Sequence, residues 1–248
     1  MKTLFRIAID GPGGAGKSTI AKRVAKILDM TYIDTGAMYR AAAYKIKKEI
    51  PHISELDLNL INDSEEYKQI KEIIEKMDID FKDGLIRVDG EIVEDKIRTP
   101  EISMLASGIS KLPIVRIYLG DIQKKIASDN NVVMDGRDIG TNIIKDAEFK
   151  IYLTASLQVR AKRRYDELKE KGKIENFDDI LEDIRKRDFQ DQARELNPLK
   201  KAEDAIELDT TNMNIEEVVN FIIREAKKLN EIMQNKARQS ELRLDKAK

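Results

Sequence analysis

The residues best suited to chemistry in this chain form a glycine-rich segment near the N-terminus. Residues 11–18 read GPGGAGKS and match the pattern G-x-x-x-x-G-K-[ST]. Glycines let the backbone wrap around phosphate oxygens with its N–H groups turned inward, and the start of the following helix adds its positive dipole end. Lys17 can reach the β- and γ-phosphates, and the Ser18 hydroxyl can bind Mg²⁺. The segment predicts a nucleoside triphosphate site.

Several classes of protein share such a phosphate loop, so the loop alone does not identify the reaction. A GTPase normally carries an N-K-x-D segment that reads guanine, but the Asn235-Lys236 pair of this chain continues with Ala-Arg. The GTPase class is therefore unsupported. A kinase of a small molecule and a P-loop ATPase that acts on a partner both remain open.

Two further polar segments follow expected strands, and each has a structural as well as a functional interpretation. Residues 34–40, DTGAMYR, open a helix, where Thr35 could cap the helix and Arg40 could hold a phosphate. Residues 135–138, DGRD, end another strand, where an arginine suits phosphoryl charge and a carboxylate suits Mg²⁺ or its waters. Ligands bind beyond the carboxyl ends of parallel strands, so both segments should lie beside the phosphate loop. The alternatives are a capped helix with a surface arginine and a salt-bridged turn.

A third group of charged residues lies in the second half of the chain. Arg187, Asp191 and Arg194 are spaced by four and three residues, which places them on one face of a helix. A solvated ladder of ion pairs explains that spacing equally well. Arg116 would by itself be taken for a surface residue, and His52, the single histidine, for an incidental one.

The elements that must position these residues alternate between strands and helices. Short apolar strands are expected at residues 4–9, 31–33, 131–136, 150–155 and 205–211. Helices are expected at residues 20–28, 37–48, 102–128 with a break near Pro113, 156–200 with interruptions at Gly172 and Pro198, and 215–223. This alternation predicts a parallel sheet with crossover helices, an α/β fold. Residues 51–104 break the pattern with a helical stretch and an antiparallel meander around Asp83-Gly84 and Asp89-Gly90, which indicates an insertion.

Composition excludes several classes of protein. The 248 residues include 45 Lys and Arg against 46 Asp and Glu, a net charge of −1 that argues against a polyanion-binding arm and against nucleic acid as a partner. Within this balance, residues 1–50 carry ten basic and four acidic residues, whereas residues 51–104 carry seven and fifteen. The chain has no cysteine and no uncharged apolar run of about 18 residues. We expect a cytoplasmic monomer that does not enter a membrane.

Several segments together resemble the bacterial-type cytidylate (CMP/dCMP) kinases, a family of nucleoside monophosphate kinases. They occur in family order from residue 6 to about 225: IAIDGPGGAGKST, YIDTGAMYRA, IRTPEIS, LPIVR, VVMDGRDIGT, KIYLTAS, RAKRRYDEL, RDFQDQAR and IELDTT. The pairing of DTGAMYR with DGRDIGT is specific to this family. Two features depart from its pattern: Gly13 stands where a serine is common, and the charged tail beyond about residue 230 is longer than the family core needs.

The resemblance implies a three-layer P-loop fold, a parallel sheet with flanking helices. The core would comprise residues 1–45, 105–155 and 201–230. Residues 46–104 would form a monophosphate-binding insertion with a small antiparallel sheet, residues 156–200 a helical lid that carries arginines, and residues 231–248 a charged tail, either a solvated helix or a frayed end.

The resemblance also assigns roles to residues. Those that would bind ATP are Gly11, Gly13, Gly14, Ala15, Gly16, Lys17, Ser18 and Thr19, with Ser18 as the Mg²⁺ ligand. Thr35 would lie near the monophosphate with Tyr39 in the same pocket, and Arg40 and Arg137 would grip the transferring and accepting phosphates, with Lys17 beside them. Four residues would recognise cytosine: Ser107, Arg116, Asp138 and Arg194. Arg187 and Asp191 would reach the ribose.

The implied reaction is transfer of a phosphoryl group from ATP to CMP or dCMP, which gives ADP and CDP or dCDP. The attacking phosphate oxygen is already ionised at pH 7, so the site needs no general base and depends on positioning and charge neutralisation. The alternatives are a P-loop kinase of another small acceptor such as UMP, and a regulatory P-loop ATPase.

Overall fold

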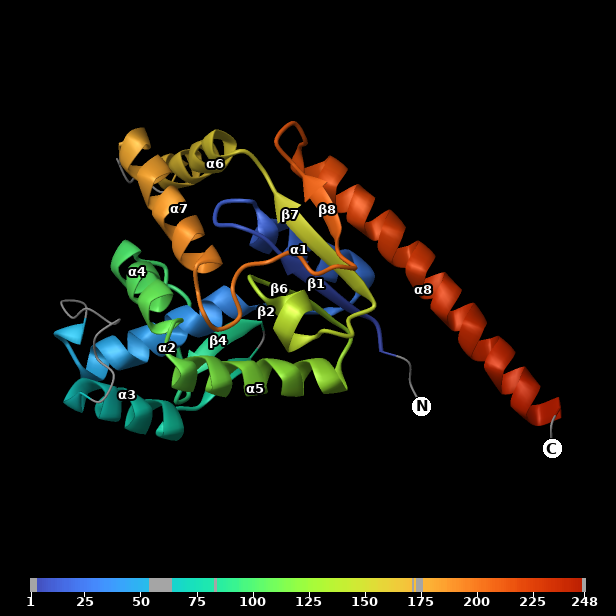
Figure 1. Ribbon diagram of the computed structural model, residues 1–248, viewed down its shortest axis with the longest axis horizontal. Helices are drawn as coiled ribbons and strands as arrows, with labels where there is room; N and C mark the ends of the chain where they lie inside the picture. Colours follow the sequence, from blue (N-terminus) through green and yellow to red (C-terminus); the bar gives the residue numbers. More distant parts are fainter. Residues whose placement is uncertain (1–3, 54–63, 83, 171, 173–175, 247–248) are drawn as a thin grey trace. The chain divides into compact units, whose positions relative to one another are not determined.

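The computed structural model describes residues 4–53, 64–82, 84–170, 172 and 176–246. The chain divides into two compact units, residues 1–33, 130–188 and 199–248 in the first and residues 34–129 and 189–198 in the second. Each unit contains one sheet with helices packed against it (Figure 1).

The first unit is built on a five-stranded sheet in the order β2-β6-β1-β7-β8. Its strands are β1 (Arg6–Asp10), β2 (Thr31–Asp34), β6 (Val132–Gly136), β7 (Phe149–Thr154) and β8 (Ile206–Asp209). The pairs β1–β6, β1–β7 and β7–β8 are parallel. In the central strand β1, Ile7, Ala8 and Ile9 are all fully buried, because helices cover both faces of a parallel sheet. The predicted α/β fold with a parallel sheet is confirmed.

Five helical segments belong to this unit: α1 (Lys17–Leu28), a short π-helical turn η2 (Ile139–Ile143), α6 (Leu157–Glu170), α7 (Phe177–Gln192), whose last turn passes into the second unit, and α8 (Ile215–Lys246). Ile20 and Val24 of α1 and Val218 and Ile222 of α8 share one apolar core with β1 and β7. Helices α6 and α7 have a smaller core of their own, centred on Ala161, Leu168, Ile180 and Ile184.

The second unit contains the antiparallel meander and four long helices among its described residues. Its elements are α2 (Thr35–Glu49), α3 (Glu65–Lys76), β3 (Ile79–Lys82), β4 (Leu85–Val88), β5 (Glu91–Ile92), α4 (Pro100–Ile109) and α5 (Pro113–Asp129). Strands β3, β4 and β5 pair antiparallel, as predicted. Asp89 and Gly90 both take positive φ, 50° and 80°, which a tight hairpin turn requires. Asp83, of the other predicted turn, lies outside the described residues.

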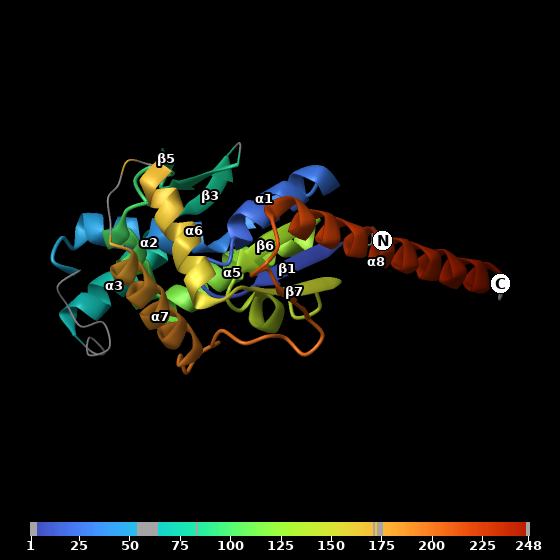
Figure 2. The same cartoon turned by 90° about the horizontal axis from the view of Figure 1, so that it is seen from above.

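Two predicted segments can be compared with the structure. The helical pattern expected over residues 156–200, with interruptions at Gly172 and Pro198, is divided into α6 and α7 by a break that includes Gly172, and α7 ends at Gln192, before Pro198. The tail beyond about residue 230, expected as a solvated helix or a frayed end, continues α8 as a helix to Lys246, and both views show its last turns extending away from the sheet (Figures 1 and 2). The charged tail is therefore helical as far as it is described.

No single helix among the described residues has both the length and the apolar character needed to cross a membrane. The bent pair α4 and α5, which meet at 98°, passes that test together by length and composition alone.

The packing of α8 generates a stability prediction. Replacing the fully buried Ile222 by alanine removes apolar contacts with α1 and the sheet and leaves a cavity, so the free energy of unfolding should fall by about 2–5 kcal/mol. Ile232 of the same helix is 42 % exposed, and Ile232→Ala should change it by less than about 0.5 kcal/mol. Urea unfolding of both variants measures the difference, and equal losses would contradict the packing described for α8.

Candidate functional site

The phosphate loop links β1 to α1 and lies against the backbone of β7. A Cβ placed on Gly11, whose φ is 150°, would lie 2.0 Å from the carbonyl oxygen of Leu153. Gly14 has φ 74°, and its Cβ would lie 3.0 Å from the carbonyl oxygen of Arg160 on α6. No side chain fits at Gly11, so the loop can pass this close to its neighbours only with glycine there.

Lys17 lies at the first position of α1 with its side chain buried beneath the loop. Its Nζ donates a hydrogen bond of 2.7 Å to the carbonyl oxygen of Pro12. Burial, and then the positive charge of Arg137, lower the pKa of Lys17 to about 7, while Asp135, Asp10 and Asp188 oppose the shift. A bound phosphate would favour the charged ammonium in the same way as these carboxylates.

Ser18 lies beside a buried carboxylate at the end of β6. Its hydroxyl donates to Oδ2 of Asp135 at 2.8 Å, and the hydroxyl of Tyr32 donates to Oδ1 at 2.9 Å. No group of three or more metal-binding side chains occurs in the described part of the chain. A hydroxyl and a carboxylate side by side still fit Mg²⁺, which takes one or two protein oxygens and completes its shell with waters and phosphate oxygens. The resemblance named Ser18 alone as the Mg²⁺ ligand, and Asp135 is thus a second candidate ligand.

Arg137 and Asp138 follow β6 directly, and Arg137 lies beside the phosphate loop. A Cβ on Gly13 would be 3.8 Å from Nη2 of Arg137, so the loop and this guanidinium are neighbours. Burial lowers the pKa of Arg137, against the opposing carboxylate of Asp135. Asp138 is buried and accepts a hydrogen bond of 3.0 Å from the amide of Asn142.

Asp10 is a buried carboxylate that the sequence analysis did not select. It ends β1, and its two oxygens accept the backbone N–H groups of Ile139 and Gly140, both at 2.8 Å. Burial raises the pKa of Asp10 to about 6, although both N–H groups act in the opposite direction. Asp10 therefore ties the strand before the phosphate loop to the segment that follows Arg137 and Asp138.

Two arginines of α6 also contact the loop; both lie in the segment RAKRRYDEL, but the resemblance assigned neither of them a role. Nη1 of Arg163 donates to the carbonyl oxygen of Ala15 at 3.4 Å. Nη1 of Arg160 donates to the carbonyl oxygen of Gly13 at 2.9 Å. Arg163 donates to the hydroxyl and the carbonyl oxygen of Thr210, at 3.1 and 2.8 Å. Their spacing of three residues places them on one face of α6, but only the fold brings that face to the loop.

In the second unit, the start of α2 differs from the expectation that Thr35 caps it. The cap is Asp34, whose extended backbone lets its carboxylate accept the N–H of Ala37 at 2.7 Å; Thr35 is the first helical residue and is buried. Asp34 also pairs with Arg40 at 3.2 Å. Among the described residues, the buried Nε of Arg40 has no hydrogen-bond partner, so a phosphate oxygen could take it.

Arg116 is not the surface residue that its sequence context suggested. It is 5 % exposed, donates to the carbonyl oxygen of Ser110 at 3.3 Å, and places its guanidinium 5.9 Å from the ring centre of Tyr39. Ser107 donates to the amide oxygen of Gln190 at 3.3 Å. The structure thus brings Tyr39 and Arg116 together from α2 and α5.

The expectation that Arg187, Asp191 and Arg194 share a helical face is wrong for Arg194. Helix α7 ends at Gln192, so Arg194 follows the helix, yet it still forms an ion pair with Asp191. Both side chains are 8 % exposed, so this pair does not belong to a solvated ladder. Arg187 lies on α7, one turn before Asp191.

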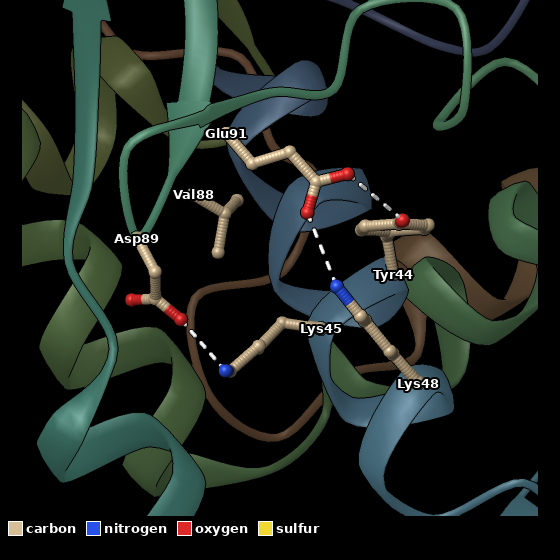
Figure 3. Close-up of a pocket in the computed structure, with 6 residues that line it drawn as sticks. All are labelled: Tyr44, Lys45, Lys48, Val88, Asp89 and Glu91. Atoms are coloured by element: carbon tan, nitrogen blue, oxygen red, sulfur yellow. Dashed lines mark hydrogen bonds and ion pairs between the residues drawn. The ribbon is translucent and has the colours of Figure 1, made fainter.

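A separate pocket of the second unit contains none of the predicted site residues. Figure 3 shows its lining from α2, β4, the turn after β4, and β5: Tyr44, Lys45, Lys48, Val88, Asp89 and Glu91. Asp89 pairs with Lys45 at 2.7 Å, and Glu91 with Lys48 at 3.1 Å and with the hydroxyl of Tyr44 at 3.3 Å (Figure 3). Its charges satisfy one another, and we attribute to them the attachment of the meander to α2.

The chain matches the family model described as cytidylate kinase over residues 7–228. It is 48 % identical over 223 residues to the cytidylate kinase of Caldanaerobacter subterraneus subsp. tengcongensis, covering 90 % of this chain and 95 % of that protein. It is 50 % identical over 218 residues to that of Clostridium tetani, covering 87 % and 91 %.

A solved structure, the shikimate kinase of Bacteroides thetaiotaomicron, is similar at 13 % identity with a TM-score of 0.46, over 91 % of this chain and 99 % of that one. The family match, by contrast, spans both units and every segment that carries a candidate residue. This chain belongs to the cytidylate kinase family.

Proposed function

We propose that this chain transfers the γ-phosphoryl group of ATP to CMP or dCMP and releases ADP with CDP or dCDP. The observation that carries this proposal is the match of the chain to the cytidylate kinase family over residues 7–228. This range includes the phosphate loop and the two polar segments at residues 34–40 and 135–138. Relatives that cover about nine tenths of the chain carry the same name.

We assign the binding of ATP, the phosphoryl donor, to residues of the first unit. The phosphate loop, Gly11 to Ser18 with Thr19, would bind the triphosphate, and Lys17 would neutralise its β- and γ-phosphates. Ser18 and Asp135 would hold Mg²⁺, which supplies charge neutralisation at the phosphate oxygens when it is bound. The buried position of Lys17 fits this role, because an ammonium held in a dry site acts strongly on a nearby phosphate.

Other residues would bind the acceptor. Thr35 and Arg40 would bind the monophosphate, with Tyr39 packed beside them. Arg40 would use its Nε, which has no hydrogen-bond partner in the described part of the chain. The residues assigned to cytosine are Ser107, Arg116, Asp138 and Arg194. Arg187 and Asp191 would bind the ribose.

Catalysis would depend on alignment and charge rather than on proton transfer. The accepting phosphate oxygen is ionised at neutral pH, so Lys17, Arg137 and Arg40 need only align the two phosphates and offset their repulsion.

We infer that residues 156–200 act as a lid that excludes water, residues 46–104 as the monophosphate-binding insertion, and residues 1–45, 105–155 and 201–230 as the core. Without water exclusion the site would hydrolyse ATP.

The acceptor panel is the direct test of this function. ADP release is measured by a coupled assay with CMP, dCMP, UMP, AMP and dTMP, and without an acceptor. We expect the highest kcat/KM with CMP or dCMP, a lower value with UMP, and little release without an acceptor. Preferred use of another acceptor, or full ATP hydrolysis with none, would contradict the proposal.

The lowered pKa of Lys17 predicts a pH dependence of ATP binding. With a pKa of about 7, Lys17 is charged below pH 7 and loses its proton above it, whereas ATP favours the charged form. ATP affinity should therefore fall as pH rises from 7 to 9, by up to about tenfold per unit. Calorimetry across this range measures the slope, and Lys17→Met should bind ATP more weakly with that slope absent. The same slope in Lys17→Met would assign it to another group.

The buried pair of Asp191 and Arg194 predicts selective damage to the acceptor site. Asp191→Asn removes a carboxylate assigned to the ribose and leaves Arg194 without its ion pair, so the Kd for CMP should rise about 10- to 100-fold. The Kd for ATP alone should stay within about twofold. Asp183→Asn, at an exposed position of the same helix, is the matched control. Equal losses for both nucleotides would remove Asp191 from the acceptor site.

A further inference from the structure

A buried ion pair of the first unit encloses the third residue of the phosphate loop. Nη1 of Arg160 lies 2.6 Å from Oδ2 of Asp188, and the same nitrogen donates to the carbonyl oxygen of Gly13 at 2.9 Å. The other carboxylate oxygen of Asp188, Oδ1, accepts the N–H of Gly13 at 3.3 Å. Both backbone polar groups of Gly13 are thus bonded to one arginine–aspartate pair.

The surroundings of this pair hold it in place. The side chain of Arg160 is 8 % exposed and that of Asp188 is 15 % exposed. Nε of Arg160 donates to the carbonyl oxygen of Ala155 at 2.9 Å, which fixes the guanidinium at the start of α6. The carboxylate of Asp188 also acts on the charges of Lys17 and Arg137. A displacement of Asp188 would therefore alter both the backbone and the charge balance of the loop.

The position of Asp188 in the sequence gives this pair a second connection. Asp188 lies on α7 directly after Arg187 and three residues before Asp191, the two residues assigned to the ribose of the acceptor. A ligand that restrains Arg187 or Asp191 restrains the helical turn that carries Asp188.

We propose that Asp188 is a positioning residue that couples the acceptor to the donor site. The proposal rests on the function proposed above. CMP bound to α7 holds Asp188, and Asp188 with Arg160 holds Gly13 in the conformation that receives ATP. The loop then loses less conformational freedom when ATP binds, so CMP tightens ATP binding, and by linkage ATP tightens CMP binding.

The alternative is that the pair only attaches the lid helices to the loop. If the pair were purely structural, its loss would lower stability, or ATP affinity, by the same factor whether or not CMP is present. Coupling instead changes the ratio of the two ATP affinities, and that ratio separates the two roles.

The experiment measures by calorimetry the Kd of the protein for the non-hydrolysable analogue β,γ-methylene-ATP in the presence of Mg²⁺. The measurement is made with and without saturating CMP. We expect CMP to lower this Kd about fivefold or more in the unchanged protein and in the control Asp183→Asn. In Asp188→Asn, which keeps the size of the side chain but not its charge, the ratio should fall below about twofold. Asp188→Glu restores the carboxylate and should recover part of the ratio. Thermal unfolding of each variant checks that it is folded.

Three results would overturn the inference: an unchanged ratio in Asp188→Asn, a ratio near one in the unchanged protein, or the same loss in Asp183→Asn. The acceptor panel on the same preparations separates this failure from failure of the proposed function. A protein that phosphorylates CMP while Asp188→Asn keeps full coupling refutes only the role of Asp188. A protein that does not use CMP refutes the proposed function, and the inference with it.

Discussion

The conformation of the phosphate loop depends on one close backbone contact, that between the loop and β7. At Gly11 there is no room even for a methyl group, because a Cβ would overlap the carbonyl oxygen of Leu153. The parallel pairing of β1 with β7 places this carbonyl there. The loop is therefore shaped by the sheet as well as by its own glycines.

Buried charge is the second constraint, and it is met by pairing rather than by solvent. Lys17 and Arg137 are both destabilised by burial, and Asp10, Asp135 and Asp188 lie close enough to offset that cost. Burial also destabilises the negative charge of Asp10, and the N–H groups of Ile139 and Gly140 reduce this cost. Such a set of mutually compensating groups suits a site for phosphates, because Lys17 and Arg137 are already desolvated and can pair with an added anion.

Local patterns were sufficient wherever the physical signal was itself local. The glycines and Lys17 of the loop, the apolar run of β1 and the Asp89-Gly90 turn each specify their own conformation, and the parallel sheet and the antiparallel meander followed from them. Thr35 was a plausible helix cap, yet Asp34 caps the helix. Asp and Thr both favour the cap position, so the sequence alone does not show which of two adjacent residues takes it. Helical spacing misplaced Arg194, because α7 ends at Gln192, two residues before it.

The sequence by itself determined the phosphate loop, the alternation of strands and helices and the family resemblance, since each is written in residue types at fixed short spacing. Only the tertiary structure decided that Arg116 is buried, that Asp10 binds the segment after Arg137, and that Arg160 and Asp188 enclose Gly13. These contacts join residues more than a hundred positions apart, or bury a charge whose own neighbours in the sequence are ordinary. Their energies come from desolvation and pairing in the folded state, which no short segment of the chain contains.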